Sequence, residues 1–215
     1  MTYLNLMVDE KNRYFERFLV LIKTTTDDDE KQIEIEREKI SEQKKHHLSS
    51  ENEDNFDDYL ADLANEAYEM KQMMHRSFVV SVFLFMESRI SSLCDHVFKE
   101  TRQKLNYRDL PGAGVIRSVR YLEKILDITF IPDLRLREEF EVARIIRNSI
   151  VHNGGVVDKD DKTKIEKYMK QYPNRLDFYD YTISIKYDYL RALFILNSNI
   201  CDEVSKNWKE FFGDS

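Results

Sequence analysis

Turn-forming residues are scarce in this chain, and this scarcity limits its possible folds more than any other feature. Only 5 glycines and 3 prolines occur among the 215 residues. A β-sandwich or β-barrel needs a turn every ~8–12 residues, and such turns favour these two residue types. Since 42% of the residues are hydrophobic, the chain can still bury a core. The sequence therefore predicts an all-α protein.

The sequence indicates neither a membrane span nor a secretory signal. The longest uninterrupted apolar run, Val82 to Met86, has five residues, whereas a membrane-spanning helix needs ~18 or more. The first ten residues lack a basic stretch followed by an apolar one. The two cysteines, Cys94 and Cys201, each lie among apolar residues, which is typical of reduced core cysteines in a cytosolic protein. We expect a cytoplasmic protein with no membrane contact.

Acidic charge is concentrated between Asp27 and Asp58. This segment holds 13 acidic and 5 basic residues, a local charge of -8, whereas the net charge of the whole chain is -7. The other 183 residues therefore carry +1, so the overall acidity does not exclude a nucleic-acid partner. We interpret the segment as a mobile or projecting helical insertion.

Residues 1–55 are expected to form an N-terminal region separate from the main bundle. The apolar spacing predicts a helix over Asp9–Lys23, followed by a break at Thr24–Asp27, where the polar side chains could cap a new helix. A charged helix would follow from Ile33. His46–Asn52 is predicted to be a polar loop, and its two adjacent histidines would point apart rather than bind one metal ion.

Residues 56–215 are expected to form a helical bundle. Three segments show apolar residues at the 3–4 spacing of buried helices: Phe78–Phe98, Leu134–His152 and Asp188–Phe211. We expect these three helices to pack together. The shorter predicted elements are a helix over Ile116–Ile128, a short helix around Lys164–Lys170, and one or two strands, as in a hairpin, within Asp177–Ile185.

Polar groups suited to phosphate chemistry gather on the last two turns of the Leu134–His152 helix. Arg144, Asn148 and His152 are spaced i, i+4, i+8 and share one face. Arg147 lies about 140° round the helix from His152. Its side chain must swing round to reach the same point, or it must meet a histidine from another chain.

A guanidinium binds phosphoryl oxygens through two parallel hydrogen bonds and stays charged at any working pH. An imidazole can take a proton from a ribose hydroxyl or donate one to a leaving oxygen. Asn148 could orient His152 or bind the phosphate, and none of this chemistry needs a metal or another cofactor. Alternatively, Asn148 and His152 form a polar cap at the helix end, and the arginines only cover the surface.

Arg147-Asn148-(x)3-His152, at a helix end and followed by Asn-Gly-Gly, resembles the Arg-polar-x(3–5)-His motif of HEPN domains. These are helical-bundle proteins prominent in bacterial toxin–antitoxin, abortive-infection and antiphage systems. The resemblance includes the core helix Phe78–Phe98 and extends over about Phe56–Trp208. A second spacing match, Arg89 to His96, lacks both the polar neighbour and the helix end.

The resemblance implies a metal-independent endoribonuclease that works as a homodimer. Arg147 would stabilise the phosphate, Asn148 would assist, and His152 would act in acid–base catalysis as the 2′-hydroxyl attacks. RNA would be the substrate, and an antitoxin or defence-system protein a further partner. One subfamily carries a modified tyrosine two residues after the histidine, a position that is Gly154 here. Other members are non-catalytic modules, so binding of a nucleotide, RNA or protein is the alternative.

Arg144, Glu87 and Asn153 are supporting candidates for this site. Glu87 shares the spacing of inward-facing residues and is expected to pair with Arg144 or Arg147.

Two further features bear on assembly and regulation. Val142 and Ile145 fall outside the main apolar stripe of their helix, so we expect a partner protomer to cover them. The Asp27–Asp58 segment is either a solvated helix or an internal inhibitor that competes with RNA phosphates.

Overall fold

The computed structural model describes residues 3–46, 53–101, 104–112, 114–125, 127, 129–131 and 133–213. These residues form six α-helices, one short 3-10 helix and one two-stranded antiparallel sheet. The elements in chain order are α1 (Tyr3–His46), α2 (Glu53–Thr101), η2 (Tyr107–Asp109), α3 (Gly114–Ile125), α4 (Leu134–Asn153), α5 (Lys159–Gln171), β1 (Leu176–Tyr179), β2 (Thr182–Ile185) and α6 (Tyr187–Phe212). The prediction of an all-α class is confirmed.

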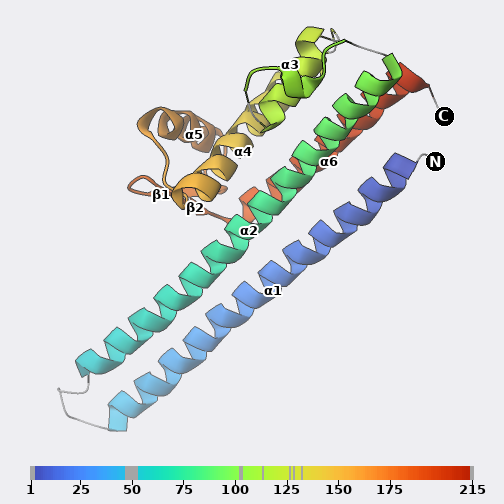
Figure 1. The fold of residues 1–215 in the computed structure, drawn as a ribbon. Coiled ribbons are helices and arrows are strands. Elements are labelled where there is room, and N and C mark those ends of the chain that lie inside the picture. Colours follow the sequence, from blue (N-terminus) through green and yellow to red (C-terminus); the bar gives the residue numbers. More distant parts are fainter. Residues whose placement is uncertain are drawn as a thin grey trace.

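Three long helices, α1, α2 and α6, lie side by side along the molecule (Figure 1). The central helix is α2, which contacts α1, α3, α4 and α6. The smaller elements α3, α4, α5 and the β-hairpin lie on the side of α2 away from α1 (Figure 1). This arrangement places the end of α4 beside the hairpin and the middle of α2.

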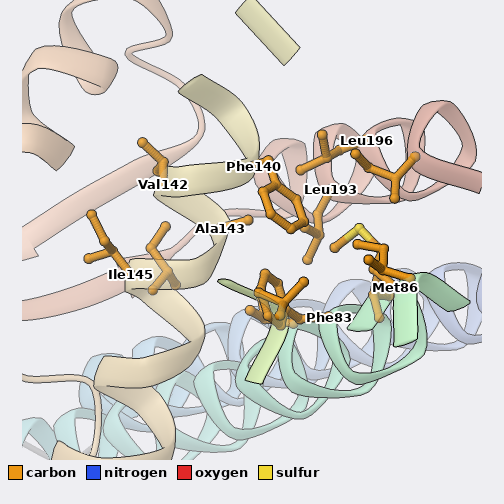
Figure 2. Close-up of a cluster of buried hydrophobic side chains, with 14 of the residues drawn as sticks. Phe83, Met86, Phe140, Val142, Ala143, Ile145, Leu193 and Leu196 are labelled. Atoms are coloured by element: carbon orange, nitrogen blue, oxygen red, sulfur yellow. The ribbon is translucent and has the colours of Figure 1, made fainter. Parts of the chain in front are cut away.

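The apolar middle of α2 provides the core on which α4 and α6 pack. The Phe83 ring stacks on Phe140 of α4, with 5.7 Å between ring centroids. Phe140, Leu193 of α6 and Met86 of α2 point toward one another (Figure 2). The three helices that the sequence predicts to pack together do contact one another, so that prediction is confirmed.

The predicted break at Thr24–Asp27 is wrong, because α1 is continuous from Tyr3 to His46. The hydroxyls of Thr24 and Thr26 donate to the carbonyls of Val20 and Lys23, each over 3.0 Å, and so stay within the helix. Thr26 is also buried, in line with Leu19 and Ile22. The apolar seam thus runs through the threonines, and its packing outweighs their preference for a helix cap.

The second half of α1 and the first half of α2 form an antiparallel pair that extends beyond the bundle (Figure 1). Lys71 of α2 donates to Glu30 of α1 over 3.1 Å, and Ile40 is 5% exposed. The described part of the acidic segment therefore packs along α2 and projects away from α4. Residues 47–52 of the predicted His46–Asn52 loop lie outside the described residues, and His46 is the last residue of α1.

Leu19 and Ile22 of α1 belong to the same core cluster as the α2, α4 and α6 residues. The first half of α1 is therefore part of the bundle's packing. The division of the chain near residue 55 stays a prediction.

Two shorter helices differ in length from their predictions, and the predicted hairpin is present. The helix α3 ends at Ile125 rather than Ile128, and Asp127 adopts a left-handed φ of 55° that ends the helical path. The helix α5 is longer than predicted, since the Asp158 side chain caps it by accepting from the Asp161 N–H. The predicted strands form a hairpin in which Leu176 pairs with Ile185.

Both cysteines are buried and free, as predicted for core residues. Burial raises the pKa of Cys94 to about 12 and that of Cys201 to about 11. Both side chains therefore stay protonated thiols near neutral pH and pack as small apolar groups.

One described helical stretch, Asp57–Thr101 within α2, is long and apolar enough to cross a membrane by length and composition. In the fold, 44% of its most apolar window is buried. This stretch contacts α1, α3, α4 and α6.

We expect the buried His75 of α2 to make stability fall as the pH is lowered below about 6.5. Its Nδ1 lies 2.6 Å from the Ile185 carbonyl oxygen and must donate to it, while Nε2 is buried without a partner among the described residues. Burial is the main cause of a lowered pKa for His75, with a smaller contribution from Lys71. Between the pKa of His75 in the folded chain and its higher pKa in the unfolded chain, His75 therefore binds a proton in the unfolded chain but not in the folded one.

The measurement is the free energy of unfolding in urea at pH 7.5 and at pH 5.5. His75→Gln keeps an N–H donor for the Ile185 carbonyl but cannot titrate, so it should lose less stability than the wild type over this range. Equal losses in both proteins would contradict this role for His75.

Candidate functional site

The helix that carries the candidate residues begins at Leu134, as predicted, and ends at Asn153, one residue after the predicted His152. At its start, the Asp133 side chain accepts from the Leu136 N–H over 2.9 Å. At its end, Gly154 adopts a left-handed φ of 62°, and the Gly155 N–H returns to the Ser149 carbonyl over 2.9 Å. This C-terminal cap fixes the last two turns, which hold Arg147 and His152.

Two separate faces of α4 are buried within one chain. Phe140 lies toward α2 and α6, whereas Val142 and Ile145 lie on the opposite flank (Figure 2). Val142 is 3% exposed and Ile145 is 2% exposed. The helix α5 contacts α4 and contributes Ile165 to the same core. The expectation that a partner protomer covers Val142 and Ile145 is therefore wrong, because the chain buries them itself.

Arg147 and Asn148 form a hydrogen-bonded pair. The Arg147 Nη1 donates to the Asn148 Oδ1 over 3.0 Å, and both residues are half-buried. The guanidinium thus swings toward the face that Asn148 shares with His152, as its position on the helix requires. His152 is exposed in the next turn. Among the described residues, Arg147 has no acidic partner, and its Nε is buried without a hydrogen bond.

The supporting candidates lie differently from their predicted positions. Arg144 is held by Glu141 through hydrogen bonds of 2.8 and 2.6 Å, which raise the pKa of Arg144 and occupy its guanidinium. Glu87 lies instead beside Gly114 at the start of α3, where its Oε1 would be 2.9 Å from an added Cβ. The expected pairing of Glu87 with Arg144 or Arg147 is therefore not part of the described contacts. Asn153 is exposed, and its carbonyl accepts from the Val156 N–H.

The backbone after α4 is fixed to the hairpin. The Ile183 N–H of β2 donates to the Gly155 carbonyl, and the Val157 N–H donates to the Tyr181 carbonyl, each over 3.0 Å. Gln72 of α2 binds the other end of β2, donating to the Ile185 carbonyl and accepting from its N–H. The end of α4 is thus held by β2, which is held by α2.

Sequence reasoning missed Arg76 of α2, which lies against the end of α4. Its guanidinium would be 3.3 Å from a Cβ added to Gly155, and its Nε is buried without a partner among the described residues. In the sequence, Arg76 is marked only by its position just before the apolar stretch of α2. That position does not show which residues Arg76 contacts. A second cation therefore lies beside the helix end that carries the motif.

We expect Gly155→Ala to be more harmful than Gly154→Ala, although both glycines have a positive φ. Gly154 has open space around an added Cβ, so alanine there should cost only the left-handed strain of about 1–2 kcal/mol. Gly155 has a φ of 94°, and an added Cβ would press on Arg76. Thermal unfolding of both variants tests this order, and Gly154→Asn should be nearly neutral, because asparagine tolerates this conformation. Equal melting temperatures for the two alanine variants would contradict it.

The arrangement offers a permanent cation, an amide and an exposed imidazole within two turns of one helix. Such a set can hold a phosphate and move protons without a metal. Among the described residues, no group of three or more His, Cys, Asp or Glu side chains could hold a metal ion. Acid–base catalysis and anion binding are the chemistry that Arg147, Asn148 and His152 can provide.

Comparisons with protein-family models, curated proteins and solved structures find no match to this chain. The resemblance to HEPN domains accordingly rests on the motif and its helical setting.

Proposed function

We propose that this protein is a metal-independent endoribonuclease of the HEPN type that acts in the cytoplasm in toxin or antiphage defence. The observation that carries the proposal is the Arg147–Asn148 pair, which lacks an acidic partner among the described residues and lies one turn before the exposed His152. By contrast, the Arg144 guanidinium is occupied by an ion pair with Glu141 over 2.6 Å.

In the proposed reaction, RNA lies across the end of α4 with a phosphate on the Arg147 guanidinium. His152 takes the proton of the ribose 2′-hydroxyl, and the 2′-oxygen attacks the adjacent phosphorus. Arg147 stabilises the charge that gathers on the phosphoryl oxygens, and Asn148 holds the guanidinium in place. The bond to the 5′-oxygen breaks and that oxygen takes a proton from the imidazolium of His152, which leaves a 2′,3′-cyclic phosphate and a 5′-hydroxyl.

The proposed active form is a homodimer in which Arg147 and His152 of both protomers share one cleft. Val142 and Ile145 do not support this dimer, because the chain buries them itself. The remaining support is Val151, which lies in the turn between Arg147 and His152 and is 46% exposed. Light scattering should give about twice the 25.8 kDa of one chain.

The first experiment is incubation of the purified protein with total RNA, with and without EDTA. We expect cleavage that EDTA leaves unchanged, since the site uses protein groups alone. Loss of cleavage in EDTA would contradict the proposal. Tight RNA binding without cleavage would favour the non-catalytic module instead.

The shared cleft has its own test, in which an Arg147→Ala protomer is mixed with a His152→Ala protomer under conditions that exchange subunits. If the two chains supply one arginine and one histidine to each site, a mixed dimer carries one intact site of two. Random exchange makes half of the dimers mixed, so the mixture should recover about a quarter of the wild-type activity. A mixture as inactive as each parent would contradict a composite site.

A further inference from the structure

A groove of about 460 Å³ runs along α2 beside Ile150 of α4. Its α2 wall consists of Glu69, Met73, Arg76, Ser77, Val80 and Ser81, and Ile150 of α4 forms the opposite wall. Ile150 is one turn after Arg147, so the two residues occupy adjoining positions on α4. The groove volume is within the range of small-ligand sites.

The groove combines an apolar wall with polar donors. Met73 is 62% exposed, and Val80 and Ile150 are half-buried. An exposed methionine beside branched aliphatic side chains offers a surface to the face of an aromatic ring. Ser77 and Ser81 are exposed hydroxyls spaced one turn apart on the same wall.

Arg76 gives the groove its cation. Its guanidinium lies over Gly155, and among the described residues it has no acidic partner. Glu69 is seven residues before Arg76, about 10 Å along the helix. A phosphate is therefore attracted to the Arg76 end and repelled from the Glu69 end, which gives a bound nucleotide one orientation.

We propose that this groove binds one nucleotide of single-stranded RNA next to the cleaved bond. Arg76 and the two serine hydroxyls hold its phosphate, and Met73, Val80 and Ile150 contact its base. The inference rests on the proposed function and extends it, because it names a second contact region for the same substrate. Arg76 is a binding residue here, and the reacting groups remain Arg147 and His152.

The test measures binding of a fluorescein-labelled single-stranded RNA of about 12 nucleotides by anisotropy. All proteins carry His152→Ala so that the RNA is not cut. Ser77→Glu and Ser81→Glu place a negative charge in the groove without removing a packed side chain. Ser92→Glu is the matched control, since Ser92 is an exposed serine of the same helix outside the groove.

We expect each groove variant to weaken RNA affinity by about tenfold, and the control to leave affinity within about twofold of the parent. Arg76→Gln should also lower the salt dependence of binding by about one phosphate contact. The serine variants keep the test decisive even if Arg76→Gln disturbs the end of α4.

Three results would overturn the inference. If RNA binds and the groove variants match Ser92→Glu, the groove is no subsite, and the proposed ribonuclease stands. If Ser77→Glu or Ser81→Glu halves the mass in light scattering, the groove is a contact between two copies of the chain. If the parent binds no RNA and the wild type cuts none, both the groove and the proposed function fall.

Discussion

His152→Ala should abolish RNA cleavage while the protein remains folded. The imidazole is exposed at the end of α4, so its removal should change the free energy of unfolding by about 1 kcal/mol or less. Loss of a general acid–base group should slow cleavage by about 100-fold or more. Initial rates on an end-labelled RNA, together with thermal unfolding, separate the two effects.

Arg147→Ala should show the same loss, because among the described residues Arg147 is the cation that donates to the Asn148 side chain. The matched control is Arg135→Ala, which removes an exposed arginine from the first turn of the same helix. The control should retain full activity. Cleavage by the His152 variant at the wild-type rate, or equal losses in both arginine variants, would contradict the assigned roles.

Ile145→Ala should destabilise the folded chain by about 2–5 kcal/mol, the usual cost of removing a buried isoleucine side chain. Ile145 is 2% exposed within one chain. The loss should therefore not depend on protein concentration, as it would if a partner protomer covered this residue.

Urea unfolding at two protein concentrations tenfold apart measures the effect. The control is Leu134→Ala, which shortens an exposed side chain at the start of the same helix and should cost little. A loss for Ile145→Ala below about 1 kcal/mol, or one that grows on dilution, would contradict burial by the chain itself.

The ends of α4 could be predicted from the sequence because local signals mark them. Asp133 caps the start through its own side chain, and Gly154 supplies the left-handed residue at the end. The hairpin was also predictable, since β-branched and aromatic residues are dense over 177–185. In each case the deciding interactions lie within a few residues of one another.

The continuity of α1 was not predictable from its threonines alone. By their local hydrogen-bonding preference, Thr24 and Thr26 favour the cap of a helix. In the fold, the seam through Leu19, Ile22 and Thr26 packs along α2, and this long-range packing decides instead.

The surroundings of the candidate site depend on contacts between distant segments. Gln72 and Arg76 approach β2 and Gly155 from α2, more than 70 residues away in the sequence. Val142 and Ile145 looked uncovered because the sequence does not show that α5 folds back onto α4. Helix periodicity identifies which faces are apolar, but it does not say which element covers each face.

The chemistry of the RNA ends tests the proposed reaction most directly. An RNA with a mapped cleavage position is cut in EDTA, and the products are identified by mass spectrometry. A matching RNA carries a single 2′-deoxyribonucleotide on the 5′ side of that position. We expect a 2′,3′-cyclic phosphate, a 5′-hydroxyl and no cutting of the deoxy-substituted RNA. Products with a 3′-hydroxyl and a 5′-phosphate, or cutting of the deoxy-substituted RNA at the same position, would contradict it.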